Sequence, residues 1–327
     1  MARRRKRGKK AKPPTLIETL RSLPATLEAR VPMEKMLETS VLSVVRKVTG
    51  GGQDLFALFC TLVNYQIDIV KFLIPMLDGF AAFLAESCGN DFERFLRVEA
   101  SDQAKILRSF PWFYTNSKGE KVPRTGWNHR FKTVDDLLCI LHKLLSYSLD
   151  DRFRETAKTL YNAAPNLKTF IEQLIGLFHN PYLCICCMKC DTDEQKAAMA
   201  QAHFMKAEVT SQSCVKKYLL FLRWMARPYP DLALWTFIPP SRLLVPIDLV
   251  VKRIMARVGV VSKEDGCVWK DVQTITDLLR QVNPDDPIAA DFAISRIGFL
   301  DICQADVAKS RCGECPLAAH CIVTRKA

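Results

Sequence analysis

Four cysteines near the end of the chain are the feature that most constrains its fold. Cys303, Cys312, Cys315 and Cys321 follow the spacing C-x8-C-x2-C-x5-C. Soft thiolates gathered over so short a segment hold an iron–sulfur cluster or a structural zinc ion, whereas disulfides would require an oxidising compartment. The spacing favours a [4Fe–4S] cluster bound by all four thiolates. Structural zinc is the alternative, and a loop without metal is the third possibility.

The composition is that of a globular protein with a basic arm. The 327 residues are 49% hydrophobic, which suffices for a large core or for two lobes. The formal net charge is +12, and residues 1–12 hold eight lysines or arginines and no acid. We interpret residues 1–14 as a disordered basic arm that suits nonspecific contact with phosphate. A solubilising tail, or a nuclear address in a eukaryotic host, would have the same composition.

The cysteines and the apolar segments also indicate a compartment. The chain has 13 cysteines, and no apolar leader follows its basic start. We therefore expect a reducing cytoplasm, or a nucleus if the host is eukaryotic, with thiols that are buried or bound to metal. Polar residues interrupt the apolar stretch 55–84, which predicts buried helices and no membrane span.

Helical signals dominate the rest of the sequence. Thr15 precedes an apolar segment with helical spacing, and Thr133 with Asp136 forms a capping box before another. The same pattern predicts helices over 151–161, 167–178, 194–207 and 268–282. The best strand candidate, residues 122–131, is short, and we expect 111–130 to be irregular. The sequence thus predicts an all-α protein.

A second group of cysteines lies in the segment YLCICCMKC. Cys184, Cys186, Cys187 and Cys190 alternate there with apolar residues. That environment favours buried free thiols, and a second metal or redox site is the alternative. A redox-sensing regulator that uses this segment is accordingly one functional hypothesis.

The cysteine loop resembles that of known enzymes. The segment CGECPLAAHC is similar to the terminal cluster loop of the endonuclease III and MutY type DNA glycosylases, which belong to the helix-hairpin-helix superfamily. The last three cysteines match its spacing, while the first interval is two residues longer. The resemblance implies a two-lobed all-α fold over 15–300, followed by an iron–sulfur cluster loop over 301–327. One lobe would combine the N-terminal helix with the C-terminal helices.

Residues 211–300 resemble a second family more closely. A Ser-x-x-Lys lead, the segment LFLRWM and the block NPDDPIAADFAISRIGFL are similar to the family of domain of unknown function 2400. That family is generally placed among the helix-hairpin-helix glycosylases, and its activity is not established. The second resemblance therefore supports the same fold.

The superfamily resemblance implies two catalytic residues. Lys216 begins an apolar helix where the bifunctional enzymes carry a nucleophilic lysine, and Asp248 in VPIDLVVKRIMARVG corresponds to the defining aspartate. A carboxylate beside the sugar would stabilise the cationic transition state, and a lysine amine could form a Schiff base. A solvated lysine and a helix-capping aspartate are the structural alternatives. The segment EVTSQSC lacks the usual glycine-rich hairpin turn, and 32 residues separate the pair instead of about twenty.

Other residues are predicted to contact DNA. The resemblance implies that Gln66, on an early helix beside Tyr65, would fill the gap left by a flipped base. Arg130 lies in a loop that mixes aromatic and basic residues, and Lys217 and Arg253 flank the catalytic candidates. We thus expect a monomeric DNA repair protein that acts on double-stranded DNA and excises a damaged or mismatched base. A noncatalytic DNA- or RNA-binding protein with the same fold and cluster is the alternative.

Overall fold

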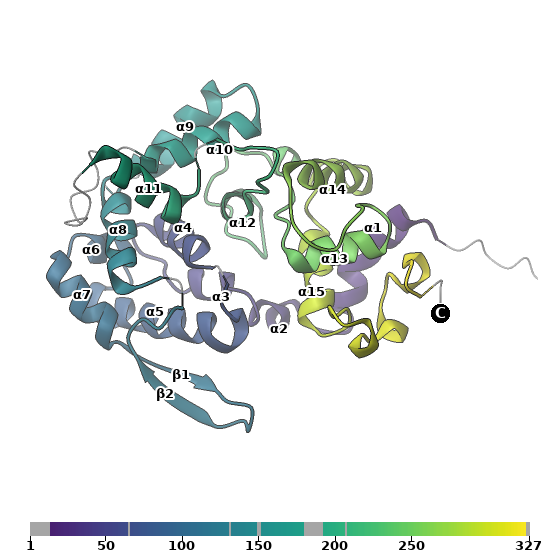
Figure 1. Ribbon diagram of the computed structural model, residues 1–327, viewed down its shortest axis with the longest axis horizontal. Coiled ribbons are helices and arrows are strands. Elements are labelled where there is room, and N and C mark those ends of the chain that lie inside the picture. Colours follow the sequence, from purple (N-terminus) through teal and green to yellow (C-terminus); the bar gives the residue numbers. More distant parts are fainter. Residues whose placement is uncertain are drawn as a thin grey trace, which may run out of the picture.

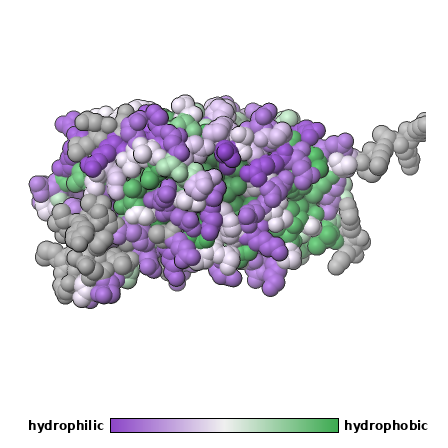
Figure 2. All heavy atoms as spheres, turned by 90° about the horizontal axis from the view of Figure 1, so that it is seen from above, coloured by the Kyte–Doolittle hydropathy of each residue, from purple (hydrophilic) through white to green (hydrophobic). Residues whose placement is uncertain are grey.

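The computed structural model describes residues 14–64, 66–130, 132–148, 152–179, 192–206 and 208–324. This part of the chain is mostly helical, which confirms the predicted class at that level. No helix within it is long and apolar enough to cross a lipid bilayer. Figure 2 shows hydrophilic residues over much of one face, with hydrophobic residues between them.

The helices form two groups that lie side by side (Figure 1). The first group contains the helices α4 Gln53–Val63, η1 Ile69–Leu73, α5 Ile74–Cys88, α6 Phe92–Leu96, α7 Ala100–Ser109, α8 Val134–Leu145, α9 Arg152–Ala163, α10 Leu167–Gly176, η2 Leu177–His179 and α11 Asp193–Phe204. The second contains α1 Leu16–Glu28, α13 Leu249–Arg257, α14 Trp269–Val282 and α15 Asp291–Phe299. The remaining helices are α2 Met33–Leu37, α3 Leu42–Val45, α12 Lys216–Ala226 and the short turns η4 Pro240–Arg242, η5 Val307–Lys309, η6 Cys312–Glu314 and η7 Ala318–His320.

Helix α1, near the start of the chain, packs against helices near its end. It buries Leu20, Leu23 and Leu27 and packs against α14 and α15. The guanidinium of Arg21 adds a hydrogen bond from Nε to the carbonyl oxygen of Val282, at 3.1 Å. The N-terminal helix therefore belongs to the same group as the C-terminal helices.

The predicted capping boxes are present in the structure. The side chain of Thr15 caps α1 and accepts a hydrogen bond from the backbone of Glu18, which bonds back to the cap. Thr133 and Asp136 cap α8 in the same way. Each reciprocal pair satisfies backbone N–H groups that the first helical turn leaves without partners. These local signals correctly fixed where both helices begin.

The segment predicted to be irregular contains a β-hairpin. Strand β1, Pro111–Thr115, pairs antiparallel with β2, Lys121–Thr125, and the hairpin projects from the helices (Figure 1). The indole of Trp112 is buried and donates a hydrogen bond to the carbonyl of Gly126. The side chain of Asn116 accepts hydrogen bonds across the turn. The predicted strand candidate 122–131 overlaps β2, whereas β1 and its pairing with β2 were not predicted.

Helices α4 and α12 form the centre of the molecule. Ten of the eleven residues of α4 are buried, and this helix packs directly against α12. Helix α12 in turn buries an almost continuous apolar and aromatic segment from Tyr218 to Ala226. Burial of this kind stabilises a helix through apolar surface removed from water, at about 25 cal/mol per Å². The first residue of α12, Lys216, is consequently held at a fixed position.

Gly298 allows α15 to pack closely against α13. A Cβ atom at this position would overlap the side chain of Val250. We expect Gly298→Ala to lower the free energy of unfolding by about 1–3 kcal/mol, because a tightly packed contact must open. Chemical denaturation would measure the change. Gly176→Ala on α10 is the matched control, since nothing lies within 4 Å of its Cβ position, and it should be neutral or stabilising by up to about 1 kcal/mol. Equal stabilities of the two variants would contradict this close packing.

Candidate functional site at the start of helices α12 and α13

The structure brings Lys216 and Asp248 together. Asp248 is the N-cap of α13, and its Oδ1 accepts a hydrogen bond from the backbone N–H of Val251 at 2.8 Å. Its other oxygen, Oδ2, lies 3.6 Å from the Nζ of Lys216, the first residue of α12. Asp248 thus caps a helix with one oxygen and faces a lysine with the other. Both side chains are partly exposed, so a ligand could reach them.

The backbone just before Lys216 is strained. Val215 has φ 39° and ψ 34°, in the left-handed region. This conformation is rare for a β-branched residue, and such strain costs on the order of 1–3 kcal/mol. The buried side chain of Val215 holds it in place. The segment before Lys216 has no glycine, so the strained Val215 makes the turn that sets the direction of the start of α12.

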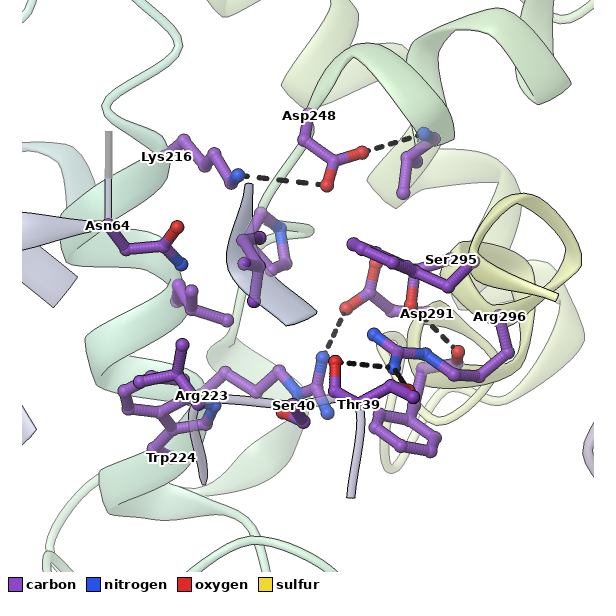
Figure 3. Close-up of a pocket in the computed structure, with 17 residues that line it drawn as sticks. Thr39, Ser40, Asn64, Lys216, Arg223, Trp224, Asp248, Asp291, Ser295 and Arg296 are labelled. Atoms are coloured by element: carbon purple, nitrogen blue, oxygen red, sulfur yellow. Dashed lines mark hydrogen bonds and ion pairs between the residues drawn. The ribbon is translucent and has the colours of Figure 1, made fainter. Parts of the chain in front are cut away.

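A small cavity lies on one side of the pair, and we call it the inner cavity. It holds about 60 Å³ and is lined by Lys216, Asp248 and further polar residues. In Figure 3, Lys216 and Asp248 lie along one side of this cavity. Arg223 and Asp291, which are joined by a hydrogen bond, lie across from them. The other polar residues that line the cavity come from several elements and are Thr39, Ser40, Asn64, Arg223, Asp291, Ser295 and Arg296.

A network of buried charges surrounds the inner cavity. Arg223 donates a hydrogen bond from Nη1 to Oδ2 of Asp291 at 2.7 Å, and from Nε to Asp231 at 3.3 Å. Arg227 binds Asp231 at 2.8 Å and Asp286 as well. Burial raises the pKa of Asp291 to about 6, although the nearby Arg223 opposes this shift. None of these residues was among the predicted site residues, and the signal that could have indicated Asp291 is an acid among apolar residues in AADFAI.

A larger depression lies on the other side of the pair, and we call it the outer hollow. It holds about 980 Å³ and shares Lys216 and Asp248 with the inner cavity. Lys132 donates a hydrogen bond from Nζ to Nδ1 of His203 at 2.8 Å. Burial, together with Lys132, lowers the pKa of His203 to about 4, so its imidazole is neutral at pH 7. The outer hollow thus offers lysine ammonium groups beside a neutral histidine.

Lys217 also lines the outer hollow. Its Nζ donates a hydrogen bond to the carbonyl of Leu62 at 3.0 Å. Burial, together with the charges of Lys132 and Lys216, lowers the pKa of Lys217 to about 8. Lys217 is therefore a second amine in the outer hollow, and a test of Lys216 as a nucleophile must include Lys217 as a control.

Two thiols, Cys214 and Cys267, lie in the outer hollow as well. A hydrogen bond from Cys267 is the main cause that lowers the pKa of Cys214 to about 7, and Lys216 contributes. The lowered pKa favours a partly ionised thiol near Lys216 at neutral pH.

The residues predicted to contact DNA differ in their distance from the Lys216–Asp248 pair: some line the cavities beside it and others do not. Gln66 is exposed and lines the outer hollow, but it does not lie on a helix as predicted. Helix α4 ends at Val63, and Gln66 adopts φ 48° in the turn that follows. Arg130 is exposed and lines neither the inner cavity nor the outer hollow. Tyr65 lies outside the described residues.

Arg253 is directed toward the cysteine loop. Its Nη2 donates a hydrogen bond to the carbonyl of Cys303 at 3.1 Å. Arg257, one turn further along α13, donates from Nη1 to the sulfur of Cys303 at 3.3 Å and pairs with Glu264 at 3.0 Å. The backbone carbonyl of Arg257 accepts a hydrogen bond from Ile322. Helix α13 thus connects the site at Asp248 with the cysteine loop.

The four C-terminal cysteines surround one small cavity. Cys303, Cys312, Cys315 and Cys321 all line it, together with Arg257. Burial, together with the charges of the three other cysteines that lie close by, raises the pKa of Cys315 to about 11. In the described part of the chain, no group of three or more His, Cys, Asp or Glu side chains is arranged to hold a single ion. The group Cys184, Cys186, Cys187 and Cys190 lies outside the described residues.

The helices that carry Lys216, Asp248 and Asp291 lie in a region whose sequence matches a known family. The model of the family described as "Protein of unknown function (DUF2400)" matches residues 97–300, which is more than half of the chain. The chain belongs to the DUF2400 family. This confirms the resemblance seen over residues 211–300. The matched region contains the inner cavity's charged residues from α12 to α15, whereas α1 and the cysteine loop lie beyond it. No curated protein and no solved structure matches the chain.

Proposed function

We propose that this DUF2400 protein is a DNA glycosylase that excises a damaged or mismatched base and cleaves the strand through Lys216. The observation that carries the proposal is the 3.6 Å approach of Lys216 Nζ to Asp248 Oδ2 where the inner cavity meets the outer hollow. A carboxylate and an amine side by side can act on the same sugar carbon. The large outer hollow would receive the flipped nucleotide.

The reaction divides between the two residues. As the bond from C1′ to the base breaks, the sugar becomes cationic, and the Asp248 carboxylate stabilises that charge. The amine of Lys216 can then attack C1′ and form a Schiff base, which permits strand cleavage. Lys132 and Lys217 in the outer hollow would attract the phosphates beside the flipped nucleotide.

The arrangement of helices supports the finer fold assignment. We propose a helix-hairpin-helix glycosylase-like fold because α1 packs with α14 and α15, while the Lys216–Asp248 pair joins α12 to α13. The natural partner would be double-stranded DNA, bound by a monomer that is associated with DNA in the cell. The projecting hairpin carries Lys118, Lys121 and Arg124 and provides a further basic surface.

The cysteine loop would hold a [4Fe–4S] cluster. The four thiols that line one cavity have the soft donor chemistry that such a cluster requires. The hydrogen bond from Nη1 of Arg257 to the sulfur of Cys303 would stabilise the negative charge of that sulfur as a cluster ligand. A bound cluster would cross-link the C-terminal loop and keep it against α13.

Lys216→Gln should abolish covalent trapping of the protein on DNA by borohydride, since the variant has no amine to form the Schiff base. Trapping would be measured on duplexes that carry lesions or apurinic sites. Lys217→Gln is the matched control, and it should retain trapping at saturating protein while binding DNA more weakly. Trapping that survives Lys216→Gln and disappears in Lys217→Gln would transfer the nucleophile to Lys217. DNA binding without base release from any duplex would instead indicate the noncatalytic binding protein.

A further inference from the structure

Asp291 carries a buried oxygen without a hydrogen-bond partner. The residue is 2% exposed, and its Oδ2 accepts the hydrogen bond from Arg223 at 2.7 Å, while Oδ1 has no partner. Leaving such an acceptor unsatisfied costs on the order of 1–3 kcal/mol. Asp291 lines the inner cavity together with Lys216 and Asp248 (Figure 3). A molecule in the inner cavity could satisfy this oxygen.

The size of the inner cavity limits what that molecule can be. Its 60 Å³ is room for about four to six waters, because each needs roughly 10–15 Å³. A nucleotide is too large for the inner cavity, whereas the outer hollow, with about 980 Å³, can receive one. The inner cavity therefore suits water, on the side of the Lys216–Asp248 pair that faces away from the bound nucleotide.

The two carboxylates of the inner cavity have different surroundings. Asp248 is partly exposed and caps α13, whereas Asp291 is buried and has its pKa raised to about 6. Asp291 is thus mostly ionised at pH 7 and able to accept a proton. Enzymes that cleave glycosidic bonds use two carboxylates in such different environments for different steps, one of which is the activation of water.

We infer that Asp291 is the general base that activates the water which captures the sugar cation. This inference rests on the base excision proposed above. The electron pair of the bond between C1′ and the base leaves with the base, which takes a proton from solvent. The oxygen of the water bonds to C1′, and one of its protons passes to Oδ1 of Asp291. The products are the free base and an apurinic or apyrimidinic site, so one water is consumed.

The test separates capture by water from capture by lysine. In a Lys216→Gln background, base release depends on water alone, and adding Asp291→Asn should slow single-turnover release by about 10²-fold or more. In the presence of Lys216, Asp291→Asn should still be trapped by borohydride. Asp286→Asn is the matched control, since Asp286 belongs to the same arginine network but does not line the inner cavity.

The pH profile provides a second measurement that leaves Asp291 unchanged. In Lys216→Gln, base release should rise with pH up to about 6 and level off above it, because only the ionised carboxylate can accept the proton. The double variant Lys216→Gln/Asp291→Asn should lack this rise of base release with pH. The charged groups around Asp291 are Arg223 from α12, Arg227 just after that helix, Asp248 at the start of α13, and Arg296 from α15.

The outcomes distinguish the two proposals. If the wild type releases no base from any lesion duplex, the proposed glycosylase activity fails and the role of Asp291 fails with it. If the wild type is active but Asp286→Asn and Asp291→Asn have equal effects in the Lys216→Gln background, only the role of Asp291 is overturned. A pH profile without a limb near 6 would overturn that role even if Asp291→Asn does not fold.

Discussion

Asp248→Asn should reduce base release by about 10²- to 10³-fold while the protein still binds DNA. The asparagine keeps the size of the side chain and removes the negative charge that would face the cationic sugar. It also keeps the cap of α13, because an asparagine oxygen can accept the hydrogen bond from Val251 as Oδ1 of Asp248 does. Single-turnover release of a base from lesion duplexes would measure the loss, and a binding assay would measure retained affinity.

The stability of this variant is an internal control. The ion pair with Lys216 is partly exposed, and such pairs contribute only about 0–1 kcal/mol. Asp248→Asn should therefore unfold near the wild-type denaturant concentration. Asp277→Asn, which removes an exposed carboxylate on α14, should change neither stability nor base release. Base release by Asp248→Asn at the wild-type rate would remove the carboxylate from the mechanism.

Cys315→Ser should remove the metal from the protein. Anaerobically purified wild type should be brown and contain about four irons per chain if the four thiolates bind one cubane. The serine variant lacks one soft ligand, so iron content and visible absorbance should fall together. Its C-terminal segment should become sensitive to proteases, although Arg30 and Thr19 still contact Glu314 and His320.

Controls for the metal prediction concern its identity and its location. Cys187→Ser should leave the iron content unchanged, because the loop at 303–321 would supply all four ligands of the proposed cluster. Half the iron in that variant would indicate a second site in the segment YLCICCMKC. Colourless wild-type protein with one zinc per chain would replace the cluster by a structural zinc ion.

Local signals in the sequence were sufficient for the helices but not for their assembly. The capping residues Thr15 and Thr133 identified helix starts because they satisfy backbone groups within four residues. Asp248 could be placed at the start of a helix for the same reason, whereas Lys216 was placed by the apolar segment that follows it, since α12 has no side-chain cap. Their approach to 3.6 Å depends on the packing of α13 against α15 and of α12 against α4, which no local pattern specifies.

Two parts of the site could not be predicted for other physical reasons. Gln66 appeared to continue a helix, but the backbone turns after Asn64 and gives Gln66 a positive φ. In the sequence, Asp291 is an acid within an apolar segment, which alone does not specify a site. Its place beside the inner cavity depends on Arg223, which reaches it across the core. Buried charge networks join residues far apart in sequence, so their members are visible only in the folded chain.

The packing of α1 against α14 also bears on how the protein is made. About 240 residues separate the end of α1 from the start of α14. At a synthesis rate of 5–20 residues per second, the apolar face of α1 would wait roughly 12–48 s for its partners on the ribosome. The second group of helices, which contains α1, α13, α14 and α15, is therefore the last to assemble. A nascent chain could form the central helices early, while the Lys216–Asp248 pair would form only after residues 269–299 have emerged.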